Sequence, residues 1–384
     1  MGCILLLHTW LMIALAISTA AHAIGLHHQT YTNAREDGEN IMNYPRAGAA
    51  CEAIEAMNQG FYNATDGRWG TSDAWWLSAN ALQAVLDYMR VTGSREYLPQ
   101  AEHTVKMQRG PLPWWPEGGG DFRADSTDDT GWWALALISL FDLTGTIAYL
   151  DIARLDEAYM FSYWSSNPCG GGIIQDIPNL TYKNAISNEL YMKLAASLYN
   201  RIPGETQYLQ RAVQSWRWFQ DSGMINPEHL INDGLTQNLS GDACSNNGQN
   251  TWTYNQGVIL GGLVELYHAT MDDEYLTSAR TIADEVLTSE TLSPGGVLKE
   301  PCDASTGCTG DQAAFKGIFV RNLADLNSVL GDRTYREYIR RNARSAWLQA
   351  RNGSNFFTDS WTGPFDKATI GSQASAASLL ISTL

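Results

Sequence analysis

Two adjacent carboxylates, Asp128 and Asp129, are the residues of this chain best suited to acid–base chemistry. They stand between a Gly-rich loop with two tryptophans, residues 113–121, and an apolar segment that begins at Thr130. Sugar chemistry needs one carboxyl group to protonate a leaving oxygen and another to attack or stabilise the anomeric carbon. Flat indole rings nearby can stack on sugar faces. The pair therefore indicates chemistry on a glycosidic bond.

A simpler role fits the same residues. Ser126, followed three residues later by Asp129, forms a helix-capping pattern, and acidic side chains are favoured in the first turn of a helix. The acids alone do not show whether they cap a helix or take part in catalysis. The choice between these roles depends on the structural elements that position them.

A quasi-repeat predicts those elements. A turn with Gly or an acidic residue precedes each of five tyrosines spaced 52 to 67 residues apart, Tyr97, Tyr149, Tyr208, Tyr275 and Tyr335. Such a period indicates repeated supersecondary units. Apolar residues at helical spacing flank each turn, so each is predicted to join two antiparallel helices.

Counting outward from the turns predicts an all-α fold. The twelve predicted helices span residues 38–58, 73–92, 95–107, 129–144, 146–164, 184–201, 205–221, 252–270, 273–288, 312–330, 333–351 and 368–383. Ten form hairpins, and the last helix is left to pair with the first and close a ring of six hairpins. The long connections between hairpins then lie at one end of the ring, where Asp128 and Asp129 open a helix. Long connections in a compact domain are usually functional.

The termini and the charge predict an exported protein. Residues 1–23 are largely apolar and end in Ala21-His22-Ala23, so we expect a cleaved secretory signal followed by one domain, residues 24–384. The net charge of −16 argues against nucleic acids and anionic membranes as partners. The apolar end, Leu379-Leu380-Ile381, is too short for a GPI signal. We therefore expect a secreted, extracellular monomer without a membrane anchor.

The cysteines predict up to two disulfides after signal removal. Cys302 and Cys308 lie close together in one loop, and Cys169 and Cys244 lie in two long loops, so these are the expected pairs. Cys51 lies in an Ala-rich helical pattern and is expected to be the odd, buried cysteine.

Other motifs are few. No Cys/His spacing resembles a zinc site, and we expect neither a metal nor a cofactor. Four sequons are candidate glycosylation sites in a secretory pathway, at Asn63, Asn179, Asn238 and Asn352.

At this point the sequence resembles glycoside hydrolase family 76, the endo-acting α-1,6-mannanases of bacteria and fungi, over nearly the whole mature chain. The segments that carry the resemblance are Asp128 to Ala136, Cys169 to Ile173, Tyr182 to Leu190, Thr251 to Gly261 and Phe315 to Phe319. The resemblance implies an (α/α)6 barrel, in agreement with the twelve helices counted above. One departure concerns a tryptophan that many members carry after Gly-Gly-Ile, where Ile174-Gln175-Asp176 stands here.

The resemblance also implies a retaining mechanism, with Asp128 as the nucleophile and Asp129 as the proton donor. We expect hydrolysis of the α-1,6-mannan backbone. An alternative is action on the mannose core of GPI anchors, with hydrolysis or transfer to wall glucan. A non-catalytic mannan-binding wall protein is an alternative of another class, which the intact acid pair disfavours.

Candidate substrate-binding residues follow the long loops or line the expected cavity. They are Trp76, Trp132, Trp133, Asn184, Asn188, Glu189, Asp233, Thr253, Tyr254, Asn255, Gln256 and Lys316. Each also has a structural interpretation, such as capping, a turn or core packing. Lys316 lies in an apolar helix and is expected to meet a carboxylate or a ligand oxygen, because an unpaired buried ammonium is costly.

Overall fold

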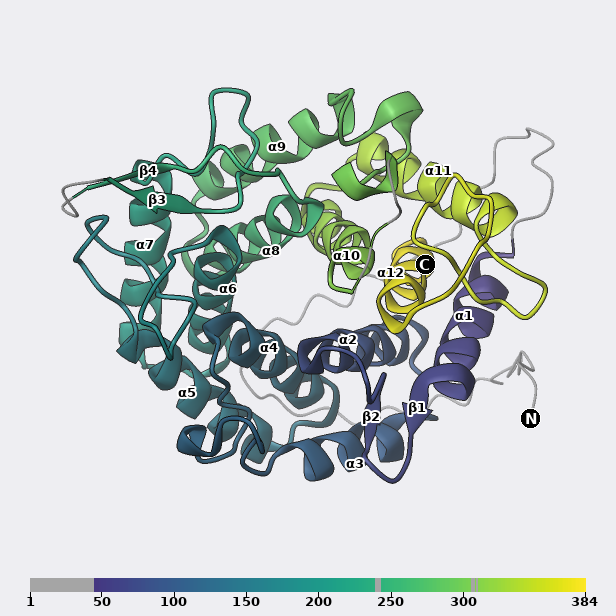
Figure 1. Cartoon of the computed structure of the whole chain (residues 1–384), viewed down its shortest axis with the longest axis horizontal. Helices are drawn as coiled ribbons and strands as arrows, with labels where there is room; N and C mark the ends of the chain where they lie inside the picture. The colour runs from purple at the N-terminus through teal and green to yellow at the C-terminus, as the bar shows by residue number, and fades with distance from the viewer. Residues whose placement is uncertain (1–44, 239–242, 305–307, 309) are drawn as a thin grey trace, which may run out of the picture.

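The helices form two concentric rings (Figure 1). The computed structural model describes residues 45–238, 243–304, 308 and 310–384, and these contain twelve α-helices. The inner ring consists of α2 (Trp75–Thr92), α4 (Thr127–Thr144), α6 (Ala185–Arg201), α8 (Thr253–Thr270), α10 (Gln312–Leu330) and α12 (Ile370–Ile381). Each inner helix contacts the next, and α12 contacts α2. The expected (α/α)6 barrel is therefore confirmed.

The outer ring surrounds it. It consists of α1 (Arg46–Phe61), α3 (Leu98–Gln108), α5 (Ile147–Ser162), α7 (Thr206–Asp221), α9 (Asp273–Thr288) and α11 (Arg333–Gln349). As expected, the last helix packs against the first, α1. Helix boundaries agree with the prediction to within three residues, except at the start of the first helix. The prediction near residue 38 is wrong there, because α1 begins at Arg46 with Pro45 as its N-cap residue.

The inner helices pack closely because two glycines lie where they meet. A Cβ atom on Gly257 of α8 would lie 2.5 Å from the Cα of Phe319, and one on Gly317 of α10 would lie 2.3 Å from the Cα of Ser375. No side chain fits at either contact. The glycines of two segments that carry the family resemblance thus bring α8, α10 and α12 together.

The long connections share one end of the barrel, because each precedes an inner helix. The connection between α1 and α2 contains the antiparallel strands β1 (Tyr62–Asn63) and β2 (Arg68–Trp69), and the one between α7 and α8 contains β3 (Leu235–Gln237) and β4 (Cys244–Asn246). Short 3-10 turns, η1 (Pro116–Gly118), η2 (Pro294–Gly296) and η3 (Pro301–Ala304), lie in two others. The amino-terminal ends of the inner helices therefore converge at this end, which we call the mouth.

Two disulfides brace the mouth. Cys169–Cys244 joins the α5–α6 connection to the α7–α8 connection, and Cys302–Cys308 closes a small loop before α10. Both expected pairings are present. The expectation that Cys51 is the odd cysteine is wrong, because Cys51 is also disulfide-bonded. Counting cysteines after an assumed cleavage could not identify this.

The predicted signal peptide, residues 1–23, lies outside the described residues. Among the described helices, none combines the length and the apolar character needed to cross a bilayer.

Candidate active site

Asp128 and Asp129 occupy the first turn of α4 at the mouth, and both are partly exposed. Ser126 is the N-cap residue, but its side chain makes no capping hydrogen bond. Its hydroxyl instead hydrogen-bonds to the two carboxylates, which lowers the pKa of each. The capping pattern therefore does not explain why two acids stand here.

Asp128 has partners that favour its ionised form. Nε2 of Gln175 lies 3.4 Å from Oδ1 of Asp128, and the backbone N–H groups of Asp128 and Asp129 also donate to this carboxylate. Burial raises the pKa of Asp128, and these hydrogen bonds oppose the rise. The positive end of the α4 dipole acts in the same direction as the hydrogen bonds.

Asp129 has surroundings that favour its protonated form. Burial raises its pKa well above the ordinary value, and the negative charges of Asp128, Asp125 and Asp311 raise it further. Of the two neighbours, Asp129 therefore keeps its proton and Asp128 loses its proton more readily. This is the division that a nucleophile and a proton donor require.

The loop before α4 supplies one of those charges. Asp125 acts on Asp129, as expected if the loop folds back. Asp121 pairs with Arg109 at 2.5 Å and is not among the charges with the largest effect on Asp129.

An aromatic belt of Trp132, Trp76, Phe315 and Tyr254 runs around the mouth from α4 through α2 and α10 to α8. Successive ring centroids are 5.5, 6.3 and 3.8 Å apart. Burial and the negative charges of Asp233, Asp128, Glu189 and Asp311 raise the pKa of Tyr254 well above its ordinary value. Tyr254 therefore lies within electrostatic range of the acids of the mouth. The structure brings together three sequence-predicted aromatic residues with the acid pair.

Asp233 lies on the same side of the mouth, held by the α7–α8 connection. Its carboxylate accepts a short hydrogen bond from the hydroxyl of Tyr182, and Asn247 donates to that hydroxyl at 3.0 Å. Burial raises the pKa of Asp233. The charge of Asp233 in turn raises the pKa of Glu189, which burial already places well above its ordinary value.

Several predicted substrate contacts instead brace the loops. Asn188 accepts from the N–H of Ile173 and donates to its carbonyl, and Gln256 does the same with Ile231. Asn184 caps α6 by accepting from the N–H of Ser187. All three predicted residues have buried side chains occupied by these bonds.

Three other predicted residues have no open face. Trp133 is 0% exposed and stacks on Phe122 away from the belt. Glu189 and Asn255 are also 0% exposed, and their side-chain polar atoms have no hydrogen-bond partner within the described part of the chain. They lie in the wall of the barrel near the mouth.

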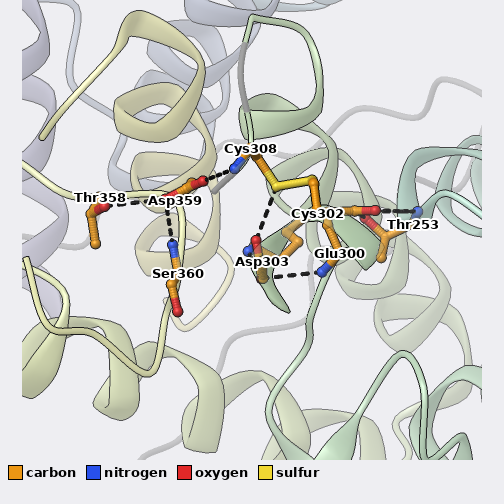
Figure 2. The surroundings of a disulfide bond; sticks show 9 residues. Thr253, Glu300, Cys302, Asp303, Cys308, Thr358, Asp359 and Ser360 are labelled. Carbon is orange, nitrogen blue, oxygen red and sulfur yellow. Dashed lines mark hydrogen bonds and ion pairs between the residues drawn. A yellow bond between two sulfur atoms is a disulfide. The ribbon is translucent and has the colours of Figure 1, made fainter. Parts of the chain in front are cut away.

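Lys316 meets a carboxylate, as expected for a buried ammonium. Its Nζ lies 2.5 Å from Oδ2 of Asp303, and the two side chains are 1% and 4% exposed. Figure 2 shows Asp303 beside the Cys302–Cys308 disulfide. Because both sulfurs are bonded to each other, the two cysteines and Asp303 do not form a metal site in this state.

Thr253 also belongs to this buried cluster. Its hydroxyl donates a short hydrogen bond to Glu300, which is 0% exposed (Figure 2). Thr253 and Lys316 therefore support the loop before α10 and do not present free polar atoms to the mouth.

Gln175 and Asp311 are mouth residues that sequence reasoning missed. Gln175 lies in the segment where many family members carry a tryptophan. This departure from the family pattern was the sequence signal that could have identified Gln175 as a site residue. Asp311 immediately precedes α10, a position where the sequence alone does not distinguish a functional acid from a helix-capping one. The Asp311 side chain makes no capping hydrogen bond.

A separate cavity of about 380 Å³ lies at the opposite end of the barrel. Charged residues of the inner helices line it, and its ion pairs include Arg201 with Asp142 and Glu265. It does not include the acid pair.

A barrel of paired helices with two differently tuned acids at its mouth is the architecture of a glycoside hydrolase. Residues 46–384 match glycosyl hydrolase family 76, and the chain belongs to that family. It is 25% identical over 368 residues to mannan endo-1,6-alpha-mannosidase DFG5 of Candida albicans, covering 87% of this chain and 79% of that protein. A putative mannan endo-1,6-alpha-mannosidase of Schizosaccharomyces pombe is 26% identical over 297 residues, 74% of this chain and 66% of that protein.

Solved structures share the fold. An inactive variant of the GH76A α-1,6-mannanase of Salegentibacter sp. HEL1_6, with two consecutive aspartates replaced by alanine and α-1,6-mannotetrose bound, superposes with a TM-score of 0.77. It is 22% identical, and the match covers 88% of this chain and 99% of that one. Dfg5 of Chaetomium thermophilum in complex with glucosamine gives a TM-score of 0.76 at 20% identity, over 88% of this chain and 89% of that one.

Proposed function

We propose that this protein is an endo-α-1,6-mannosidase that cleaves the backbone of α-1,6-mannan with retention of configuration. The observation that carries the proposal is the pair of adjacent carboxyl groups at the start of α4. Burial raises the pKa of both, but hydrogen bonds oppose the rise at Asp128 and neighbouring acids add to it at Asp129. The names of the relatives and the inactive double-aspartate variant bound to a mannotetrose support it.

Two displacements follow from these roles. First, Asp129 gives its proton to the glycosidic oxygen while Asp128 attacks C1, so the C1–O bond breaks and a glycosyl ester forms on Asp128. Then Asp129, now a carboxylate, takes a proton from water as the water oxygen attacks C1 and releases Asp128. The converging amino-terminal ends of the inner helices stabilise the negative charge on Asp128 in each step.

We assign sugar contact to four of the predicted substrate-binding residues. Trp76, Trp132 and Tyr254 belong to the aromatic belt, where the two indoles are largely buried and would contact the sugar by their edges, and Asp233 offers a carboxylate to a sugar hydroxyl. The others act by holding the loops and walls in place, with Glu189 and Asn255 as polar groups of the barrel wall.

A second candidate is glycosidase or transglycosidase action on a GPI-core glycan. The charged groups with the largest effects on Asp129 and Tyr254 are all acidic, and such a mouth favours a substrate that carries a protonated amine. The Dfg5 relative binds glucosamine, an amine-bearing sugar.

Secretion is part of the same proposal. Two disulfides among the described residues are typical of an oxidising compartment. The sequon residue Asn179 is exposed and open to glycosylation.

The test is incubation of the full chain with unbranched α-1,6-mannan and, separately, with a GPI-core glycan, with products identified by mass spectrometry. Mannan cleavage that Asp128→Asn abolishes supports the primary function. Preferential processing of the amine-bearing glycan moves the assignment to the second candidate. Binding of mannan without turnover of either substrate would leave a non-catalytic wall protein.

A further inference from the structure

Asp311 joins two parts of the mouth that are far apart in sequence. Its Oδ1 accepts a hydrogen bond of 2.8 Å from Nε1 of Trp76, 235 positions away. Asp311 is exposed at the start of α10, whereas Trp76 is a buried residue at the start of α2. The bond therefore fixes the orientation of a belt indole from outside the belt.

The Trp76 ring in turn packs against a ring of α4, the helix that carries the acid pair. Trp76 stacks on Trp132 with centroids 5.5 Å apart and planes inclined by 26°. Trp132 lies one turn after Asp129 on α4, so the two side chains share a helix face. Asp311 therefore anchors one end of a series of packed side chains, Trp76 and then Trp132, that ends beside Asp129.

Asp311 also brings a charge to Asp129. The charged groups with the largest effects on Asp129 are Asp128 on α4, Asp125 in the preceding loop and Asp311 immediately before α10. The other elements around the mouth contribute Tyr254 from α8, Glu189 from α6, and Asp233 from the α7–α8 connection. No cation ranks among the largest influences on either Asp129 or Tyr254, and the hydrogen bond with Ser126 is the influence that lowers the pKa of Asp129.

We propose that Asp311 is a positioning residue of the active site, which locks the Trp76 indole against Trp132 and places a negative charge opposite Asp129. This inference rests on the proposed function and adds a residue to it. The carboxylate has two separable roles, as an acceptor for the indole N–H and as a charge that keeps the neighbouring acid protonated.

Substitutions separate the two roles. Asp311→Asn keeps an acceptor oxygen and removes the charge, whereas Asp311→Ala removes both. Trp76→Phe keeps a ring and removes the N–H donor. Asp125→Asn removes a second charge near Asp129, and Asp151→Asn removes a charge from the exposed surface of α5 as the matched control.

The first measurement is a carboxyl-carbon NMR titration of the full chain, with the Asp129 signal assigned by its loss in Asp129→Asn. We expect the Asp129 midpoint to fall by a few tenths of a pH unit in Asp311→Asn, because an exposed charge acts through a high effective dielectric constant. Asp125→Asn should shift it in the same direction and further, and Asp151→Asn should not shift it. An unchanged midpoint in Asp311→Asn overturns the charge role, whether or not the protein cleaves mannan.

The second measurement is the pH profile of kcat/KM on α-1,6-mannan. Asp311→Asn should move the alkaline limb to lower pH with an unchanged KM. Asp311→Ala and Trp76→Phe should both raise KM, but only Asp311→Ala should also move the limb. Equal KM values in all folded variants overturn the positioning role. An inactive wild type refutes the proposed function, and the NMR titration then tests the charge role of Asp311 by itself.

Discussion

Nε2 of Gln175 lies 3.4 Å from Oδ1 of Asp128, so a residue of the α5–α6 connection donates to the acid assigned as the nucleophile. The same connection is tied to the α7–α8 connection by Cys169–Cys244. The nucleophile therefore depends on loop structure as well as on its own helix.

Gln175→Leu should move the acid limb of kcat/KM to higher pH. Loss of the donor favours the protonated form of Asp128, so its pKa rises and less nucleophile is ionised at acid pH. The long bond predicts a loss of about 1 kcal/mol, or roughly 5-fold in kcat/KM. Gln210→Leu on the exposed surface of α7 is the control, and an unshifted acid limb would refute the contact.

Asp129→Asn should depend strongly on the leaving group. A poor leaving group such as a sugar needs the proton of Asp129, whereas an activated aryl mannoside leaves without it. Rates with the two substrate types, measured for wild type and variant, give the ratio. An equal loss on both substrates would remove the proton-donor role.

The free energy of unfolding should fall as pH rises from acid to mildly alkaline conditions. Burial raises the pKa of Glu300 from an ordinary 4.5 to about 8. Its stabilising contribution is present in full below about pH 4.5 and is lost as pH rises through about 8, an effect on the order of a few kcal/mol.

Urea unfolding across that pH range measures the effect. Glu300→Gln should flatten the curve, and Glu337→Gln on the exposed surface of α11 should not. A wild-type stability that increases towards pH 8 would contradict the assigned shift.

Lys316→Met should destabilise the fold by about 3–5 kcal/mol, because it leaves the buried carboxylate of Asp303 unpaired. The double variant Lys316→Met/Asp303→Leu should recover part of the loss. Denaturant unfolding and KM, measured together, distinguish this role from substrate binding. A raised KM in a variant of unchanged stability would restore Lys316 as a substrate contact.

The helical ring was predictable because its signals are local. Each turn that precedes Tyr97, Tyr149, Tyr208, Tyr275 or Tyr335 is flanked by apolar residues at helical spacing, and both are visible within about twenty residues. The apolar face of the last helix also required a partner, which α1 supplies.

The details of the mouth were less predictable because they depend on contacts across the ring. Polar residues at the start of an inner helix can face either the cavity or a neighbouring loop, and spacing does not distinguish these directions. Asn188 and Gln256 turn to loop backbones, whereas Tyr254 stacks on Phe315 of α10 within electrostatic range of the acids. The bond between Trp76 and Asp311 spans 235 positions and leaves no local pattern.

NMR observation of the first product released from α-1,6-mannan tests the central claim most directly. Two displacements through a glycosyl ester on Asp128 predict that the new reducing end appears first as the α-anomer and mutarotates afterwards. A β-anomer as the first product would contradict the account, because it requires direct attack by water and a base other than Asp128.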